Sequence, residues 1–385
     1  MSPVLSPPPR QHVGTEPPPA LDPEALIEEA RRRARRRRAG WTAAALIVIA
    51  IALGAYFGFG GGTRTPPRSG TPSTPSRGLP PAGDVVGMQR VPPSETVLFA
   101  ARAGTLFEVS VPRSSRNDRV TLMRVSRNGT VARRRARIDR AVFLMDLSTG
   151  PDGLYAGTAV VKRFVNAPDE LVRIDPATLT VRAHGFFPSR VAAVEQGGRM
   201  WASLGDGRVL RLDPRTLAVA ASRRLLPRRA ALLGLTLSKP AVGLGSLWVI
   251  AGDERGLDLV RMDPVSLAVR SRTRIPKAGA LNAVVADPHH AYLAGQAVAP
   301  VAGTGRLRGR PTLVRQLQTV GIHGDGLVGL TYPPAVELLT PAGRIRARTR
   351  FLDAGAQLVV SGRDVWFSGN AGHGNGIVHV RLRAR

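Results

Sequence analysis

The stretch LVRIDPATLTVRAHGFFP, residues 171–188, returns twice further along the chain, as VLRLDPRTLAVAASRRLLP at 209–227 and LVRMDPVSLAVRSRTRIP at 259–276. Each copy has an apolar–Arg–apolar triplet, then Asp-Pro, a Ser or Thr, and a Leu. Apolar residues that alternate with arginine have the two-residue period of a strand, and the proline ends strand pairing. Each copy therefore predicts two short strands around a turn.

The acids of these copies are Asp175, Asp213 and Asp263, each placed directly before the proline. At the first position of a type I turn, an aspartate carboxylate accepts the backbone N–H two residues on, and proline presets the next φ. The same chemistry recurs wherever such turns occur. We therefore interpret the three acids as turn formers rather than as ligand-binding groups.

A second recurring element is a large apolar residue in a strand that follows a glycine-bearing turn, as in DGLYAG or SGRDVWFSG. Successive positions are separated by 48, 46, 47, 44, 36 and 38 residues, which is the spacing of four-stranded propeller blades. We expect these side chains to form the core between blades. The seven positions are Phe107, Tyr155, Trp201, Trp248, Tyr292, Val328 and Trp366.

The predicted fold class is therefore an all-β, seven-bladed propeller over residues 84–385, with strands A to D in each blade. The last blade supplies only three strands before the chain ends at Arg385. An open ring would expose strand edges. We expect residues 84–91, DVVGMQRV, to add the missing outermost strand and to join the two ends of the domain.

The unit GSLWV...LVRMDPVSLAVRSRTRIP resembles the repeats of YVTN-type and virginiamycin-B-lyase-like seven-bladed propellers, and the resemblance covers roughly residues 84–385. It implies the propeller fold. It implies no particular activity, because that superfamily contains lyases, surface-layer proteins and binding modules. No lyase catalytic residue can be matched in this sequence.

Catalytic motifs are missing from the sequence, which has no GxSxG, HExxH or GxxxxGK[ST]. We predict no metal, no cofactor and no catalytic residue. Binding is favoured over catalysis, with a propeller enzyme of lyase type as the alternative. The candidate acid–base side chains are scattered singly or in pairs: Asp253, Glu254, His289, His290, His323 and His373.

Insertions in the repeats are expected in the B-to-C loops, which should share one face of the disc. From the aromatic residue to the Asp the distances are 20, 12 and 15 residues, whereas from the Asp to the closing Pro they are 13, 14 and 13. Repeat proteins usually place such insertions on the face that binds. The predicted ligand-binding residues of this rim are Asp253, Glu254, Arg306, Arg308, Arg310, Asn370, His373 and Asn375.

The N-terminal part predicts a membrane anchor. Residues 41–60 contain no charge and are long enough to cross the hydrocarbon core as a transmembrane helix. The preceding basic block keeps residues 1–40 in the cytoplasm and places the propeller outside the plasma membrane, with 61–83 as a Gly/Pro/Ser/Thr linker. A cleaved signal peptide is the alternative. The membrane-surface residues are Arg31, Arg32, Arg33, Arg35, Arg36, Arg37 and Arg38.

The net charge of +28 does not by itself indicate nucleic acid. Residues 1–40 hold eight Arg and five acids, which leaves +25 for the remainder. The basic block beside the span is interpreted as a topology signal that contacts anionic lipid at the cytoplasmic face. Arginine runs in the propeller are expected in solvated outer strands. A basic exported domain would be drawn to an anionic envelope polymer or an exported protein, and nucleic acid is not an expected partner.

Overall fold

The computed structural model divides the chain into two units, Met1–Pro75 and Ser76–Arg385, and the residues that it describes belong to the second. The predicted cytoplasmic tail, span and most of the linker lie outside them. Among the described residues, no helix is long and apolar enough to cross a membrane. The described ranges are 79–91, 95–112, 119–126, 130–138, 143–159, 169–227, 237–253, 256–276, 281–314, 317–332, 334–351, 353–370 and 376–383.

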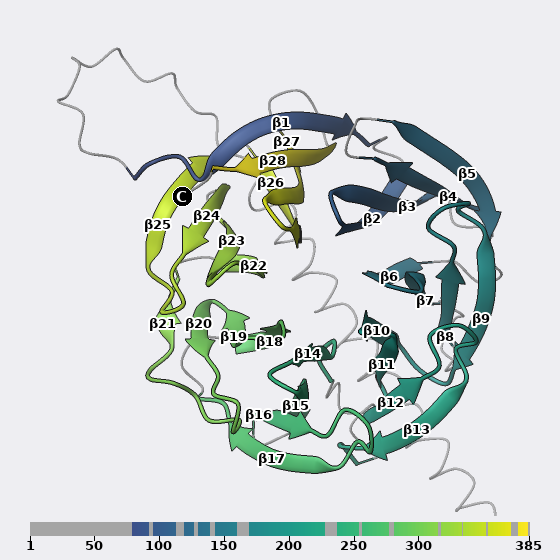
Figure 1. The fold of residues 1–385 in the computed structure, drawn as a ribbon, viewed down its shortest axis with the longest axis vertical. Helices are drawn as coiled ribbons and strands as arrows, with labels where there is room; N and C mark the ends of the chain where they lie inside the picture. Colours follow the sequence, from purple (N-terminus) through teal and green to yellow (C-terminus); the bar gives the residue numbers. More distant parts are fainter. Residues whose placement is uncertain are drawn as a thin grey trace, which may run out of the picture. The chain divides into compact units, whose positions relative to one another are not determined.

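Every described strand belongs to one of seven four-stranded antiparallel sheets, arranged as blades around a centre (Figure 1). Blades 1 to 3 have the following strands: β2 (Glu95–Arg102), β3 (Thr105–Pro112), β4 (Arg119–Val125) and β5 (Val131–Arg137); β6 (Phe143–Gly150), β7 (Gly153–Ala159), β8 (Asp169–Ile174) and β9 (Val181–Phe187); β10 (Val191–Gln196), β11 (Arg199–Leu204), β12 (Arg208–Leu212) and β13 (Val219–Arg224).

Blades 4 to 6 follow the same order from the innermost to the outermost strand: β14 (Ala241–Gly243), β15 (Ser246–Asp253), β16 (Gly256–Met262) and β17 (Val269–Arg274); β18 (Leu281–Ala286), β19 (Ala291–Gly295), β20 (Ala297–Pro300) and β21 (Thr312–Leu313); β22 (Leu317–His323), β23 (Gly326–Thr331), β24 (Ala335–Leu339) and β25 (Ile345–Arg350). The predicted all-β, seven-bladed propeller is confirmed.

Blade 7 is built from both ends of the domain. Its three C-terminal strands are β26 (Asp353–Ser361), β27 (Asp364–Asn370) and β28 (Gly376–Leu382). Its outermost strand is β1 (Gly83–Arg90), which pairs antiparallel with β28 from Gly83↔Leu382 to Arg90↔Gly376. Figure 1 shows β1 running outside β28. The predicted closure is thus confirmed, and the strand begins one residue earlier than expected.

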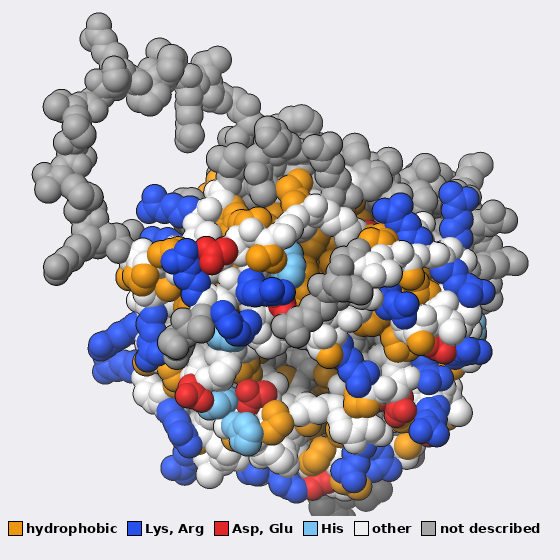
Figure 2. Space-filling view, turned by 45° about the horizontal axis from the view of Figure 1, so that its top comes forward, with side chains coloured by type: hydrophobic (Ala, Val, Ile, Leu, Met, Phe, Trp, Pro, Cys, Tyr) orange, Lys and Arg blue, Asp and Glu red, His pale blue; other side chains and the backbone are white. Residues whose placement is uncertain are grey.

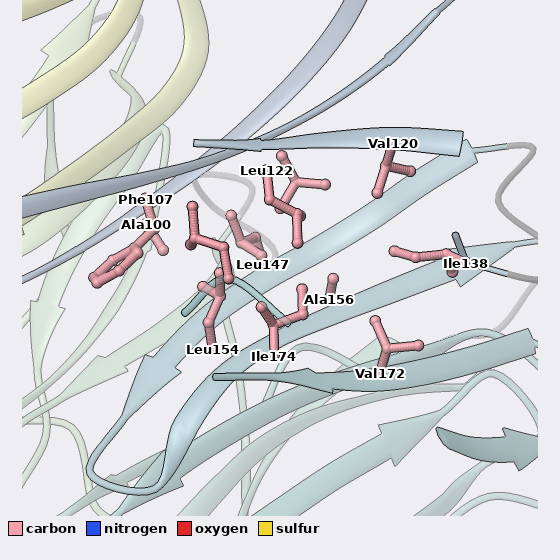
Figure 3. Packing of buried hydrophobic residues seen from close by; sticks show 12 residues of the cluster. Ala100, Phe107, Val120, Leu122, Ile138, Leu147, Leu154, Ala156, Val172 and Ile174 are labelled. Carbon is pink, nitrogen blue, oxygen red and sulfur yellow. The ribbon is translucent and has the colours of Figure 1, made fainter. Parts of the chain in front are cut away.

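The hydrophobic core is divided into seven clusters, and each cluster joins two neighbouring blades. Figure 3 shows the cluster between blades 1 and 2, where Phe107 and Leu122 face Leu154 and Ile174. All seven positions of the predicted aromatic series lie in the second strand of their blade and are buried. Their interpretation as core between blades is confirmed.

The repeated Asp-Pro turns connect the third and fourth strands of blades 2, 3 and 4. In each turn the Asp carboxylate accepts two backbone N–H groups, as Asp213 does from Arg215 and Thr216 at 2.9 and 2.7 Å. The Leu of the turn donates its N–H to the Asp carbonyl, as Leu217 does at 2.8 Å. The aspartates are turn formers, as predicted.

The preceding blade holds two of these turns by a hydrogen bond. The Tyr155 hydroxyl of blade 2 donates to the Pro214 carbonyl of blade 3 at 3.0 Å. The Trp201 indole of blade 3 donates to the Pro264 carbonyl of blade 4 at 2.7 Å. In these two cases the aromatic side chain of one blade holds the Asp-Pro turn of the next.

Candidate functional site

The innermost strand of each blade lies around the centre of the propeller: β2, β6, β10, β14, β18, β22 and β26 (Figure 1). A cavity of about 500 Å³ lies among these strands in blades 3 to 7. Most of the residues that form its wall are small and apolar, such as Val194, Val242 and Gly321. This central channel is the candidate functional site, because propellers leave their largest concave surface around the axis.

One ion pair crosses two blades of the channel. Lys239, in the connection that enters blade 4, places its ammonium 2.7 Å from a carboxylate oxygen of Asp146 in blade 2. The other carboxylate oxygen of Asp146 accepts the backbone N–H of Ala193 in the intervening blade 3 at 3.0 Å. Three blades are thereby tied together by one acid. Lysine is rare in this chain, which has only Lys162, Lys239 and Lys277.

Two exposed amide side chains accompany this pair. Asn282 is the second residue of β18, Gln318 is the second residue of β22, and both line the central cavity. Strands β18 and β22 begin at the face that holds the B-to-C and D-to-A connections, and Lys239 belongs to such a connection. We call Asp146, Lys239, Asn282 and Gln318 the channel-mouth set. The set has no net charge and offers both hydrogen-bond donors and acceptors.

Among the described residues that line this cavity there is no histidine, and Asp146 is already paired with Lys239. Within the described ranges, no group of three His, Cys, Asp or Glu residues could hold a metal ion. His289 and His290 lie in a turn around Asp287, whose carboxylate accepts both of their backbone N–H groups. His323 bonds the carbonyl of Gly362 at 2.8 Å.

The predicted binding rim is only partly described. Glu254, His373 and Asn375 lie outside the described residues, and the same holds for the basic block of the tail. Asp253 ends β15 and Asn370 ends β27, so their backbones lie at the B-to-C face as predicted. The positions of their side chains are not described, and the binding role of these residues stays a prediction.

The predicted placement in a B-to-C loop was wrong for Arg306, Arg308 and Arg310, and their binding role stays a prediction. These exposed arginines lie between β20 and β21, so they belong to a C-to-D connection on the opposite face from Asp253. The reason is that Ala297–Pro300 forms the third strand of blade 5 directly after a one-residue turn. Alanine and proline are poor strand formers, so the sequence pattern favours a loop here.

Outer strands carry much of the arginine, as predicted, and Lys and Arg side chains are spread over the visible surface (Figure 2). Several are paired with acids of their own blade. Arg182 lies 3.1 Å from Asp175, and Arg274 lies 3.0 Å from Asp258. For Arg306, Arg308 and Arg310 no ion pair is found among the described residues. The fixed positive charge of the outer strands is therefore partly neutralised, which weakens its pull on a polyanion.

The fold defines the chain as a seven-bladed β-propeller, and comparisons with solved structures agree. It is similar to BamB from Moraxella catarrhalis, with 14% identity, a TM-score of 0.51, and coverage of 77% of this chain and 100% of that chain. It is also similar to the WD40 β-propeller domain of Doa1, with 10% identity, a TM-score of 0.52, and coverage of 79% and 97%. At such identities the likeness shows the fold alone.

No family model matches the chain, and no curated protein matches it either. The resemblance to YVTN-type and virginiamycin-B-lyase-like repeats is thus confirmed as far as the propeller fold, and the particular family stays a prediction. Sequence reasoning missed the channel-mouth set, because Lys239 and Asp146 are 93 residues apart and belong to no repeated motif. The rarity of lysine was the one signal in the sequence.

Proposed function

We propose that this chain is a membrane-anchored binding module, held in the plasma membrane by residues 41–60, whose propeller lies outside the cytoplasm and takes its ligand at the channel mouth. The uncharged stretch and the arginines before it support the anchor and its orientation. A C-terminal alkaline phosphatase fusion tests this topology, and activity outside the cell is the expected result. Activity of a cytoplasmic reporter alone would refute it.

The observation that carries the binding role is the neutral channel-mouth set. Two amide side chains line the same cavity as Lys239, whose charge is already balanced by Asp146. Such a site would bind a group that both donates and accepts hydrogen bonds, and the apolar wall below it would cover the flat face of that group. The ligand class that fits is a hydroxyl- and amide-rich chain, such as the end of an envelope carbohydrate polymer.

A titration of the purified full-length chain with chito-oligosaccharide, followed by calorimetry, tests the channel site. We expect saturable binding and a loss of at least tenfold in affinity for the double variant Asn282→Ala/Gln318→Ala, because two hydrogen-bonding groups are removed. The matched control is Gln296→Ala, an exposed amide in a turn of the same face outside the channel. Equal losses in both variants, or no binding of the sugar, would count against the proposal.

A further inference from the structure

The junction between blade 7 and blade 1 contains a second cavity, of about 410 Å³. It lies between the strands β1, β27 and β28 on one side and β3 and β4 on the other. We call it the seam pocket, and the described residues around it include Met88, Gln89, Leu106, Val125, Trp366 and His379. It is separate from the central channel, since the two cavities share no described residue.

The other six junctions are filled by an apolar side chain that the next blade contributes. Leu179, Leu217 and Leu267 of the Asp-Pro turns are buried against the preceding blade. Leu307 and Ile345 pack into the next two junctions, and Ala82 is buried where the chain ends meet. Each of these six junctions is therefore filled by a small aliphatic side chain of the next blade, which we call the plug.

The seam differs from these six junctions. The corresponding connection of blade 1 has the sequence SRNGT at residues 126–130, which contains no apolar residue. The strand that follows begins at Val131, which is 50% exposed, whereas Leu179 of the next junction is 2% exposed. Among the described residues, the seam cluster has four buried members, and the other clusters have between eight and twelve. Among the described residues, no side chain takes the place of the aliphatic plug at the seam.

A second difference enlarges the space. In blades 1 to 4 an arginine stands opposite the aromatic residue, and Arg124 and Arg211 donate to carbonyls of the next blade's Asp-Pro turn. Opposite Trp366 stands the shorter His379 instead, stacked on the indole at 4.7 Å and bonded to Asp364 at 2.9 Å. Burial lowers the pKa of His379.

We propose that the seam pocket is a docking site for a leucine-bearing turn of a partner polypeptide, which fills this junction as the Asp-Pro turns fill the others. The leucine side chain packs against Leu106, Val125 and Trp366. The backbone carbonyls of the turn accept from donors at the seam. Among the described residues, no hydrogen bond from the indole N–H of Trp366 is present, whereas Trp201 uses that group to hold a turn carbonyl.

The chain itself provides the probe. A synthetic peptide with the sequence of residues 173–182, RIDPATLTVR, carries one complete turn. Labelled with a fluorophore, it should bind the purified full-length chain saturably in an anisotropy titration, with a Kd on the order of 0.1–1 mM. The same peptide with serine in place of leucine should bind at least tenfold more weakly, because the buried apolar group is lost.

Two variants locate the site. Ser126→Phe fills the pocket from blade 1, so it should weaken peptide binding at least tenfold. His379→Arg restores the guanidinium that Arg124 and Arg211 direct at turn carbonyls in other junctions, so it should strengthen peptide binding. His289→Arg adds the same charge at an exposed turn and should leave binding unchanged. The proposal is overturned if the peptide does not bind, if leucine and serine peptides bind equally, or if neither pocket variant differs from the control in binding.

Discussion

At the residue scale, the most informative positions are the leucines of the Asp-Pro turns. Leu179, Leu217 and Leu267 have φ values of 54°, 62° and 58°, in the left-handed region that leucine avoids. That conformation costs roughly 1–2 kcal/mol, whereas full burial of a leucine side chain contributes roughly 1.5–3 kcal/mol. The backbone strain persists because burial against the preceding blade outweighs it.

This balance predicts that glycine and alanine variants of Leu217 do not follow the usual order of stability, in which alanine is the more stable. Leu217→Ala should lower the free energy of unfolding by about 2–5 kcal/mol, because it loses the burial and keeps the strain. Leu217→Gly should be no less stable than Leu217→Ala, since glycine relieves the positive φ. Urea unfolding measures both. At the control position Leu210, buried in β12, glycine should be the less stable of the two; the same order at Leu217 would contradict the strain argument.

The turn aspartates predict how stability depends on pH. Burial acts to raise the pKa of Asp175, but hydrogen bonds from Thr178, Ala177 and Arg182 outweigh it and lower the pKa to about 2. Hydrogen bonds from backbone N–H groups also lower the pKa values of Asp213 and Asp263. The pKa values in the folded state thus lie below the unfolded value of about 3.9.

A carboxyl group with a lowered pKa stabilises the fold above its unfolded pKa, and this contribution disappears as the pH falls through the folded pKa. The urea midpoint should therefore decline between about pH 4 and pH 2. The triple variant with Asp→Asn at these three turns should start lower at pH 7 and decline less. Parallel curves for the two proteins would show that the turns do not contribute to acid unfolding.

At the element scale, a blade is not stable by itself, because each sheet buries its faces against two neighbours. Hydrogen bonds from second-strand aromatic residues fix the distance between successive blades, as Trp201 does with Pro264. Trp248 differs, since its indole donates to Gly243 of its own blade at 2.8 Å. The two tryptophans have the same position in the repeat and different structural roles.

Replacement of each tryptophan by phenylalanine separates these roles. Trp201→Phe should cost about 0.5–1.5 kcal/mol, and hydrogen exchange at Leu267 in the following turn should become faster, because the turn loses its anchor to blade 3. Trp248→Phe removes the same kind of bond and should leave exchange at Leu267 unchanged. Faster exchange in both variants would mean that loss of packing, and not the hydrogen bond between blades, is responsible.

At the scale of the whole molecule, stability depends on closure of the ring. The β1 strand covers the outer edge of β28, and Arg383 contacts Asp84 at 2.7 Å beside it. This exposed ion pair adds little, so the strand pairing carries the closure. The side chain of Ala82 is fully buried at the same place, which extends the core across the two ends of the domain.

Deletion of residues 83–90 should lower the melting temperature by several degrees and make the protein self-associate, because the edge of β28 would be free to pair with another chain. Differential scanning calorimetry and light scattering measure the two effects. Deletion of residues 71–78 of the linker, which are also eight residues, serves as the control. It should change neither the melting temperature nor the self-association. An unaltered melting temperature without β1 would show that closure does not depend on this strand.

The sequence by itself determined the number of blades, the strand order around the Asp-Pro turns and the closing strand. These are local, periodic signals: the Asp-Pro turn and the aromatic residue return at nearly constant spacing, and each is read within a dozen residues. Even the missing strand followed from counting, since three strands in the last blade left one to be supplied. Turns and strands are specified by interactions between residues that are close in the sequence, so they can be predicted from the sequence.

Only the tertiary structure decided which residues meet. It placed Arg306, Arg308 and Arg310 on the opposite face, because Ala297–Pro300 forms the third strand of blade 5 and the segment after it is a C-to-D connection. It brought Lys239 to Asp146 across 93 residues, and among the described residues it placed no aliphatic plug at the seam. Such sites arise where strands of different blades pack, and packing depends on the three-dimensional arrangement of side chains that no local period of the sequence records.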